Sequence, residues 1–393
     1  MKEAGRNIAA VARTAADEPR ASVAVHCTPA AAIAAYRTLE HCATFSPAQS
    51  PAWVSAWIGE IKPDFVVASL SHYGVPSYAL ALEIVRRGPF RVARFMGGHH
   101  ANGNFSPLAR SAPPLSRANL HDLIASIGKA RPDIDLLSLE RVADSIQDRT
   151  NPLMALGCRQ SPNPALAIDL SGGFDVLLER MSGKRKRNRS QSRKFEAAGG
   201  FRVVTAKTPD EASRLLEAFF AMKQERFRKM GLPDVFGAPE VRRFFHRLFR
   251  EALAEKNPPF VLEGLEVAGQ LRAVTGSSRC GGRLVCEFGA IREDELSRLS
   301  PGDFLFFDSI RRACEKGFAF YDFSVGDEPY KRLWCDVEIT HYDVLVPMTM
   351  RGSILARAMR AKSRLKAFVK RNSIAWRLTK ALRRRGLIRS EQS

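Results

Sequence analysis

The sequence lacks the marks of a membrane-spanning, secreted or metal-binding protein. No stretch of its 393 residues approaches the ~20 consecutive apolar residues that a membrane-spanning helix needs. The N-terminus has no apolar core of a signal peptide. The seven cysteines are scattered singly, without a CxxC pair or a Cys/His grouping at zinc spacing. These absences predict a cytoplasmic protein with reduced thiols and no metal site.

Acidic residues are also few, above all near the C-terminus. The sequence holds 61 Lys and Arg against 41 Asp and Glu, a formal net charge of +20. Residues 351–390 contain no Asp or Glu, and a second basic cluster occupies 184–194. Such a surplus favours an anionic partner: nucleic acid, acidic lipid or a phosphorylated small molecule. The alternative for each cluster is a solvated surface, which is common for charge runs.

The order of the expected secondary structure is similar in the two halves of the chain. Each half reads as helices, a meander of strands, a helix and a strand. In the first half we expect a strand at 22–27, helices at 29–42, 50–61 and 117–130, and strands at 65–74, 77–88, 90–98 and 133–142. In the second half we expect helices at 183–200, 209–230, 239–256 and 300–317, and strands at 201–206, 260–267, 270–278, 283–291, 318–324 and 337–347.

Proline and glycine cluster at 158–173, which predicts the linker between the halves. The predicted organisation is therefore a disordered leader at 1–20, one unit at 21–160, a second at 161–350, and a tail at 351–393. In the tail, Leu355, Met359, Leu365, Val369, Trp376 and Leu382 recur near helical spacing among bases. A basic amphipathic helix suits an anionic membrane surface, and the alternatives are packing on the protein's own body or RNA binding.

The element order and three motifs resemble the GNAT acyltransferases, in particular their CelD-like branch, which is linked to cellulose and exopolysaccharide synthesis. The motifs are "AYRTLE…FSPAQSPAWVSAW" (35–57), "GKRKRNRSQSRKFEAAGGFRV" (183–203) and "LSPGDFLFFDSIRRACEKGFAFYDFSVGDEPYKRLW" (299–334). The resemblance implies an α+β fold with tandem GNAT-like domains, the first of them degenerate, in which mixed sheets are flanked by helices and a basic helical tail follows. It also implies an acyl-CoA donor, such as acetyl-CoA, and an amine or hydroxyl acceptor. The tandem arrangement is similar to the Fem-type aminoacyltransferases as well, which use aminoacyl-tRNA.

The resemblance places the donor's pyrophosphate at the N-terminus of the helix after the fourth strand, where backbone N–H groups and the helix dipole favour phosphate. The equivalent stretch here is "SRLSPGDF" (297–304). The implied cofactor-binding residues are Arg298, Ser300, Gly302, Asp303 and Phe304. The full glycine pattern of the family is missing, and Asp303 would repel a phosphate. An ordinary helix start is the alternative for this stretch.

Acyl transfer needs a base for the acceptor and an acid for the departing thiolate. Glu287 lies on the strand that often holds the base in GNAT enzymes. Between Cys286 and Phe288, its carboxyl would have a pKa raised by desolvation. A solvent-facing strand residue is the alternative. Asp322 follows apolar residues on the strand at 318–324, and a buried carboxylate there needs a partner, for which Lys331 is the natural candidate. Asp322 is therefore either a second candidate base or half of a structural ion pair.

Tyr330 lies where GNAT enzymes often place their general acid, and a phenol can donate to a thiolate. Its alternative is packing on Trp334, one turn along the same helix. Lys331 is predicted to hold a phosphate or carboxylate of the substrate. The neighbouring histidines His99 and His100 point apart on an extended chain, which is poor for joint metal ligation. Their loop belongs either to the acceptor cleft or to a surface turn.

Three functions follow from these residues. The first is an acyl-CoA-dependent acyltransferase that modifies a sugar or polysaccharide precursor, cytoplasmic and peripheral at the inner membrane face through 351–393. The second is a Fem-like aminoacyltransferase, for which the +20 charge would serve tRNA. The third is a non-catalytic GNAT-like scaffold docked at the membrane. The absence of a long coiled-coil arm counts against the second.

Overall fold

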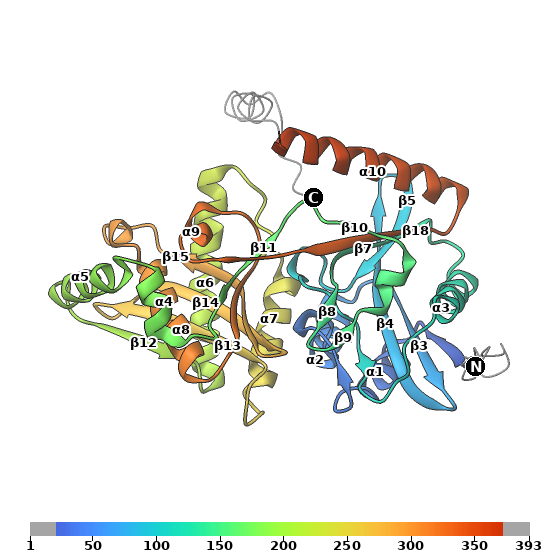
Figure 1. The fold of residues 1–393 in the computed structure, drawn as a ribbon, viewed down its shortest axis with the longest axis horizontal. Helices are drawn as coiled ribbons and strands as arrows, with labels where there is room; N and C mark the ends of the chain where they lie inside the picture. The colour runs from blue at the N-terminus through green and yellow to red at the C-terminus, as the bar shows by residue number, and fades with distance from the viewer. Residues whose placement is uncertain (1–20, 372–393) are drawn as a thin grey trace, which may run out of the picture.

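Two mixed β-sheets, each with helices on its faces, lie side by side in the computed structural model, which describes residues 21–371 (Figure 1). We call the parts around the two sheets the first and the second lobe. The α+β class predicted from the sequence is confirmed. The predicted leader at 1–20 and the last part of the tail, 372–393, lie outside the described residues.

The first sheet is built mainly from the N-terminal half of the chain. Its strand order is β1 (Ala21–His26), β3 (Phe65–His72), β4 (Val75–Arg87), β5 (Phe90–Phe95), β7 (Leu136–Ala143), β18 (His341–Pro347) and β10 (Cys158–Gln160). The short strands β2 (Ala43–Thr44) and β6 (Leu108–Ala109) pair beside β4, and β8 (Ser145–Ile146) and β9 (Arg149–Thr150) form a small hairpin. The helices of this lobe are α1 (Pro29–Arg37), α2 (Pro51–Ile61), α3 (Arg117–Ala130) and, from the C-terminal tail, α10 (Met350–Arg371).

The second sheet repeats this plan. Its order is β12 (Phe201–Thr205), β13 (Phe260–Val267), β14 (Gln270–Cys280), β15 (Arg283–Ile291), β16 (Phe320–Val325), β11 (Ala165–Asp169) and β17 (Val337–Ile339). Its helices are α4 (Gly173–Arg180), α5 (Lys184–Ala197), α6 (Pro209–Met230), α7 (Pro239–Ala252), α8 (Pro301–Glu315) and α9 (Pro329–Arg332). The local sequence explains the bounds of α6, since Thr208 and Glu211 form a capping box and Gly231 ends the helix with positive φ.

One pair of neighbouring strands in each large sheet runs parallel, among the residues that the structure describes. In the first sheet β5 and β7 pair only at Val92–Leu136 and Ala93–Leu137. In the second, β15 and β16 pair from Arg283–Phe320 to Val285–Asp322. Both pairs separate beyond these positions, although β15 continues to Ile291. Each lobe therefore has a gap in its sheet beyond these positions.

The sequence predicted one strand at 337–347 in the second lobe, and this prediction is wrong. The stretch forms two strands, β17 in the second sheet and β18 in the first, with only Thr340 between them. The chain crosses in the other direction between β10 and β11. In Figure 1 the red-brown segment with β18 can be followed from one lobe into the other. Each sheet is thus completed by a strand from a crossing segment.

The two lobes also share a hydrophobic core. Trp53 and Trp57, one turn apart on α2, both contact Phe244 of α7 edge-on, with ring centroids 4.9 Å apart. These three rings are buried in one continuous cluster that extends into both lobes. Aromatic pairs in this geometry contribute about 0.5–1.5 kcal/mol beyond their buried area, so the lobes are held in one arrangement.

The first part of α10 packs on the first lobe. Ala356 is fully buried against Val92 and Leu136, and Leu355 and Met359 pack on the same cluster. Among the alternatives for the tail, packing on the protein's own body therefore holds for this part of the helix. Met350 and Ile354 remain exposed, at 84% and 64%.

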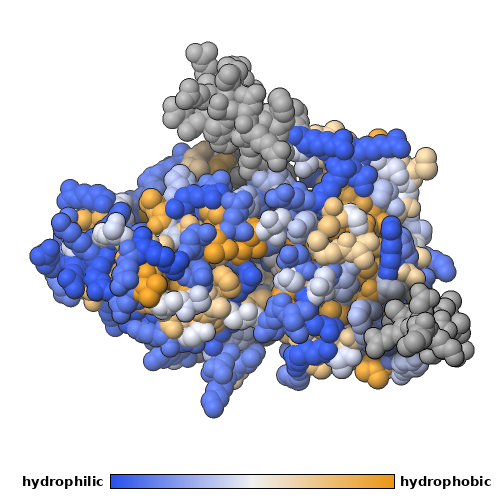
Figure 2. Space-filling view, viewed as in Figure 1, coloured by the Kyte–Doolittle hydropathy of each residue, from blue (hydrophilic) through white to orange (hydrophobic). Residues whose placement is uncertain are grey.

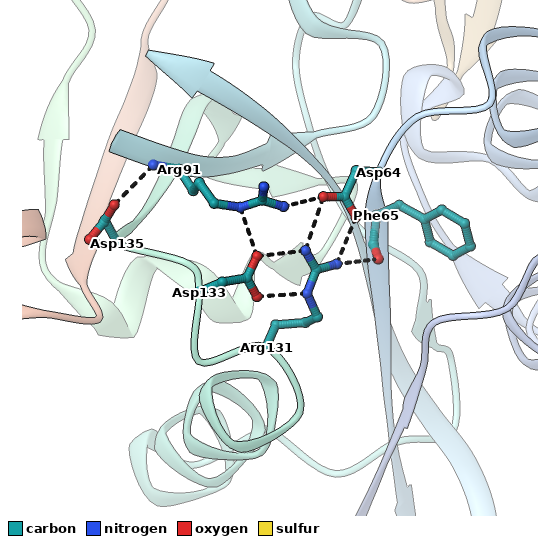
Figure 3. A network of polar contacts seen from close by, with 6 residues as sticks. All are labelled: Asp64, Phe65, Arg91, Arg131, Asp133 and Asp135. Atoms are coloured by element: carbon teal, nitrogen blue, oxygen red, sulfur yellow. Dashed lines mark hydrogen bonds and ion pairs between the residues drawn. The ribbon is translucent and has the colours of Figure 1, made fainter. Parts of the chain in front are cut away.

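A network of charges ties the edge of the first sheet to the end of α3 (Figure 3). The guanidinium of Arg131 binds the carboxylates of Asp64 and Asp133 at 2.8 Å each and donates to the carbonyl of Phe65. Arg91 binds the same two carboxylates from β5. Hydrogen bonds from Arg131 lower the pKa of Asp64 and bring that of Asp133 down to about 2. The segments joined here are far apart in the sequence.

Replacing Arg131 with Ala should lower the free energy of unfolding by about 1–3 kcal/mol at neutral pH, since charged hydrogen bonds are lost and solvent weakens each remaining contact. Both carboxylates have a lower pKa in the folded protein than in the unfolded chain, where it is near 4. Their contribution to stability is therefore present at pH values above about 4 and is lost as the pH falls toward 2. Urea denaturation should therefore show a difference between wild type and variant at pH 7 that shrinks by pH 3. A control, Arg228→Ala, breaks an exposed pair with Glu225 and should change little.

Candidate functional site

Glu287 lies at a β-bulge in β15. In the register of β14 and β15, Gly276 faces Phe288 and Ser277 faces Cys286, which leaves Glu287 as an extra residue without a partner. Bulges bend a strand and redirect a side chain, and they are frequent beside active sites. The bulge follows directly after the last paired position of β15 and β16, so Glu287 lies where the gap begins.

The carboxyl of Glu287 is buried and only half satisfied. Ser278 Oγ donates a hydrogen bond of 2.6 Å to its Oε1, while Oε2 is buried without a hydrogen-bond partner. Burial raises the pKa of Glu287 to about 7, the hydrogen bond from Ser278 opposes this, and the charge of Asp322 adds to it. The residue as a whole is half-buried, so it lies neither in the core nor on the open surface that the alternative assumed. A carboxyl with a pKa near 7 can accept a proton at physiological pH.

Glu287 opens into a narrow cavity of about 70 Å³ between the lobes, which we call the interlobe cavity. Its walls from the second sheet include Arg283, Val285, Glu287, Asp322 and Ser324. The first lobe contributes η1 (Pro47–Gln49), the loop at Asn102 and the β8–β9 hairpin. The site therefore requires both lobes.

Asp322 lines the same cavity as Glu287. The sequence analysis had named both residues as catalytic candidates. The backbone N–H of Ser324 donates to its Oδ1 at 2.7 Å, and Arg283 lies 3.7 Å from Oδ2. Burial raises the pKa of Asp322. The predicted ion pair of Asp322 with Lys331 is wrong, because Arg283 is the cation at ion-pair distance.

His341 is a residue of the cavity that the sequence analysis missed. It is 5% exposed at the start of β18, and its Nδ1 is buried without a hydrogen-bond partner. Burial lowers the pKa of His341 to about 4, so the imidazole is neutral at pH 7. Its place depends on the crossing of β18 between lobes, so no local pattern could have identified it. Two unpartnered polar atoms, on Glu287 and His341, thus belong to residues of one cavity.

Lys331 and Tyr330 do not line the interlobe cavity. Lys331 is 5% exposed, and its ammonium contacts the carbonyls of Ser324 and Val325 and the carboxylate of Glu328 at 2.9 Å. The lysine therefore stabilises the turn between β16 and α9, and the prediction that it holds the substrate is wrong. The Lys331 side chain is buried, and its ammonium already contacts groups of the protein.

Tyr330 is 45% exposed and its ring stacks on Phe306, with an angle of 3° between the planes. The alternative of packing on Trp334 is wrong, because Trp334 is buried elsewhere. Its indole N–H donates to Asp303 at 2.9 Å, and the ammonium of Lys184 lies 3.5 Å from its ring centroid. Partial burial raises the pKa of the Tyr330 phenol above its ordinary value near 10.

The predicted pyrophosphate site at the start of α8 lies against the basic helix α5. A cleft of about 430 Å³ between them is lined by Lys186, Arg187, Lys194, Arg298 and their neighbours, and no acid lines it. We call it the α5–α8 cleft. Ser300 makes no side-chain cap for the helix and instead accepts a hydrogen bond from Arg187. Figure 2 shows mostly hydrophilic side chains over α5, at the left of the view.

Three of the predicted cofactor residues have structural roles. Asp303 accepts from Lys184 at 2.9 Å and lies 3.3 Å from Arg187, so its charge is compensated and does not oppose a phosphate. Gly302 packs against Ile291, where a Cβ would come within 2.9 Å. Phe304 is 4% exposed in the core beside Phe195 and Phe201, so the prediction that it faces the donor is wrong. Arg298 lines the cleft, and Ser300 contacts it through its hydrogen bond with Arg187.

Metal ligands do not cluster in this part of the chain. Within residues 21–371, no three His, Cys, Asp or Glu side chains come together in a way that could hold a metal ion. All seven cysteines lie in this range and are free. No helix of the described residues is long and apolar enough to cross a membrane.

Comparison with known protein families decides what this arrangement is. The segment that contains α5, β15, α8, β16 and α9 matches the family described as acetyltransferase (GNAT) domain. The match covers residues 182–332, which is less than half of the chain. The match supports the predicted acyltransferase activity for this segment. Glu287, Asp322, Tyr330 and the α5–α8 cleft all belong to it, while the first lobe and His341 lie outside the matched segment.

Solved structures with the same fold extend over both lobes. The structure of FemX is 12% identical, covers 83% of this chain and 97% of its own, and has a TM-score of 0.54. L-PGS from Bacillus licheniformis is 12% identical over 87% of this chain and 98% of its own, with a TM-score of 0.52. A conserved protein of unknown function from Bacteroides thetaiotaomicron is also 12% identical, over 83% of this chain and 100% of its own, with a TM-score of 0.52. The predicted tandem GNAT-like fold is thus confirmed. No curated protein matches the sequence.

Proposed function

We propose that the chain transfers an acyl group from acyl-CoA to an amine or hydroxyl group of a sugar or polysaccharide precursor, with Glu287 as the general base. The observation that supports this best is the unpartnered Oε2 of Glu287, buried at a bulge where β15 and β16 separate. An acceptor N–H or O–H placed in the interlobe cavity would supply the missing hydrogen bond. A pKa near 7 suits a base that must be ionised before each turnover.

The reaction moves one proton at each end. Glu287 takes the proton from the acceptor as its nitrogen or oxygen attacks the thioester carbonyl. The carbon–sulfur bond then breaks, and the CoA thiolate takes up a proton while the new amide or ester remains. Tyr330 is the proposed donor of this second proton, from α9 at the end of β16. Asp322, at hydrogen-bond distance from Ser324 N and near Arg283, is proposed to orient the acceptor.

The α5–α8 cleft is the proposed site for the donor's phosphates. Four cationic side chains line it, and the first turn of α8 has no side-chain cap to satisfy its N–H groups. Arginine binds phosphate oxygens in a bidentate manner, and helix N-termini favour negative charge. Arg187 and Arg298 are the proposed contacts, and Asp303 holds Lys184 and Arg187 in place.

The nature of the acceptor and the place of action rest on sequence features. The motifs that resemble the CelD-like branch support a saccharide acceptor and a link to cellulose or exopolysaccharide synthesis. A cytoplasmic enzyme that touches the inner membrane face would use the bases of 351–393 together with the exposed Met350 and Ile354. Part of that tail lies outside the described residues.

A second candidate is an aminoacyltransferase that uses aminoacyl-tRNA. The observation that favours it is the basic surface of α5, whose outer side chains Arg185, Lys186, Arg189 and Arg193 line a further open cleft of about 780 Å³. RNA backbones bind such surfaces through counterion release, so this binding would weaken steeply with salt. The third candidate, a scaffold without catalysis, would leave Glu287 idle.

Calorimetry of the full chain with acetyl-CoA, longer acyl-CoAs and tRNA separates the candidates. We expect CoA thioesters to bind, and Arg187→Gln/Arg298→Gln to weaken that binding by ~10-fold or more, because each charged hydrogen bond is worth about 1.5–3 kcal/mol. The control Arg228→Gln/Arg250→Gln removes the same charge from exposed positions on α6 and α7 and should bind normally. Absence of CoA binding would exclude the acyl-CoA donor, and salt-sensitive binding of tRNA alone would favour the aminoacyltransferase.

A further inference from the structure

The gap in the first sheet contains a second basic site, unrelated to Glu287. A cavity of about 290 Å³ opens where β5 and β7 separate, and we call it the arginine cleft. Arginines from three neighbouring strands line it, together with a single acid, Glu140; they are Arg86 and Arg87 of β4, Arg94 of β5 and Arg141 of β7. The cleft thus has the same place in the first sheet as the β15–β16 gap in the second.

Most of these guanidinium groups have no carboxylate partner. Arg94 is paired with Glu83 at 2.8 Å. Arg86, Arg87 and Arg141 form no ion pair within the described residues; Arg141 donates instead to the carbonyl of His99 and to Asn102. The remaining acids nearby in the described chain are Glu140, which lines the cavity, and Asp343, and the charges of both act on Arg141. An excess of positive charge remains that favours an anion.

The geometry of the cleft is fixed by its surroundings. Arg141 has a φ of +55°, which is rare for an arginine, and its backbone N–H donates to Asp343 of the crossing strand β18. Gly98 leaves room for the Arg94–Glu83 pair, because a Cβ there would lie 2.8 Å from the Arg94 guanidinium. Burial lowers the pKa of His99, the charges of Arg94 and Arg141 add to this, and the charge of Glu140 opposes it, as expected for a loop beside several arginines. The site is preorganised for negative charge.

The cleft continues under the C-terminal helix. A neighbouring cavity of about 530 Å³ shares Arg87, Glu140 and Arg141 and extends between β18 and α10, where Arg159 and Arg360 also line it. Arg87 touches Met359 of α10 at 3.4 Å. The two cavities share part of their lining, so together they have room for a phosphorylated ligand with a bulky remainder.

We propose that the arginine cleft binds the pyrophosphate group of a small molecule, a nucleotide sugar or a molecule of CoA. A pyrophosphate diester carries two negative charges and several acceptor oxygens, which match three guanidinium groups better than a single carboxylate does. The cavity is compact, at about 290 Å³, which suits a small molecule. Binding here is independent of the base in the GNAT domain, so this inference does not depend on the proposed reaction.

Calorimetry at low salt with inorganic pyrophosphate, UDP, UDP-glucose and CoA tests the proposal on the full chain. CoA is titrated into Arg187→Gln/Arg298→Gln, so that the α5–α8 cleft does not contribute. We expect at least one of these probes to bind with a Kd below about 1 mM. Arg86→Gln/Arg87→Gln, at exposed positions where folding is not at risk, should weaken it by ~10-fold or more.

The controls separate this site from the reaction. Arg228→Gln/Arg250→Gln, with the same loss of charge outside the cleft, should bind as wild type does, and so should Glu287→Gln. Binding of UDP-glucose identifies a nucleotide sugar as the source of the pyrophosphate, and binding of CoA identifies a donor-type ligand. The proposal is overturned if none of the probes binds, or if Arg86→Gln/Arg87→Gln binds as tightly as the control.

Discussion

Replacing Glu287 with Gln is expected to lower kcat/KM for acyl transfer by ~10²–10⁴, the usual contribution of a general base. Glutamine keeps the size of the side chain and can still accept a hydrogen bond from Ser278 on its carbonyl oxygen. It cannot take a proton from the acceptor. Steady-state rates of thiol release from acyl-CoA, measured with the acceptor that the wild type uses, would show the loss.

The pH profile distinguishes a base from a merely structural carboxyl. The pKa of Glu287 is raised to about 7, so the wild-type rate should rise through neutral pH as the carboxyl ionises. The hydrogen bond from Ser278 lowers that pKa, so Ser278→Ala should move the rising limb to higher pH. If Glu287→Gln keeps most of its activity, or if the limb does not move in Ser278→Ala, Glu287 is not the base.

Loss of folding would not explain the loss of rate. The pKa of Glu287 is higher in the folded protein than in the unfolded chain. Its carboxyl therefore stabilises the fold most at pH values below the unfolded pKa, and this contribution is lost as the pH rises through about 7. Above that pH the buried carboxylate is a cost that glutamine avoids. Urea denaturation at pH 8 should therefore find Glu287→Gln at least as stable as the wild type.

Residues 21–160 expressed alone are expected not to fold. This fragment matches the first unit predicted from the sequence, but it lacks β18, which pairs with β7 along six positions. Val344 of β18 is fully buried in the core, and Ala356 of α10 is fully buried against Val92 and Leu136. Losing these hydrogen bonds and contacts should cost about 5 kcal/mol or more, which is comparable with the whole stability of a small domain. Circular dichroism and gel filtration would show an unfolded or aggregated fragment.

A matched fragment tests the reason. Residues 21–160 joined through a flexible linker to 341–364 regain β18 and the packed part of α10, and this chain should show a cooperative urea transition. If 21–160 alone unfolds cooperatively, the crossing strand is not required and the predicted boundary at 160 is a true domain boundary. Failure of both fragments would indicate that the shared core with α7 is required as well.

Much of the fold could be predicted from local patterns. The capping residues Thr208 and Glu211, the periodic apolar positions of 209–230 and the glycine at 231 fix α6 to the residue. In the strands of both meanders, apolar residues either alternate with polar ones or form continuous runs, as they do in buried strands. Strands β10 and β11 were missed because they are only three and five residues long and depend on partners from distant segments.

The candidate site was predicted in part. Glu287 and Asp322 lie together in one cavity, and the raised pKa predicted for Glu287 is found, with burial as its main cause. Sequence spacing could not show that Lys331 turns inward to Glu328, nor that Tyr330 stacks on Phe306. Those contacts depend on the direction in which the chain leaves β16.

The sequence by itself determined the element order, the GNAT-like character, the basic surplus and the carboxyl at the centre of the site, because these depend on periodicity and on residues close in the chain. Only the tertiary structure decided that Thr340 separates strands of different lobes, that His341 joins Glu287, and that four arginines meet at the β5–β7 gap. These arrangements depend on pairing between segments up to two hundred residues apart, such as Arg141 and Asp343. No local pattern records such a pairing, because its free energy arises only when both sheets are assembled.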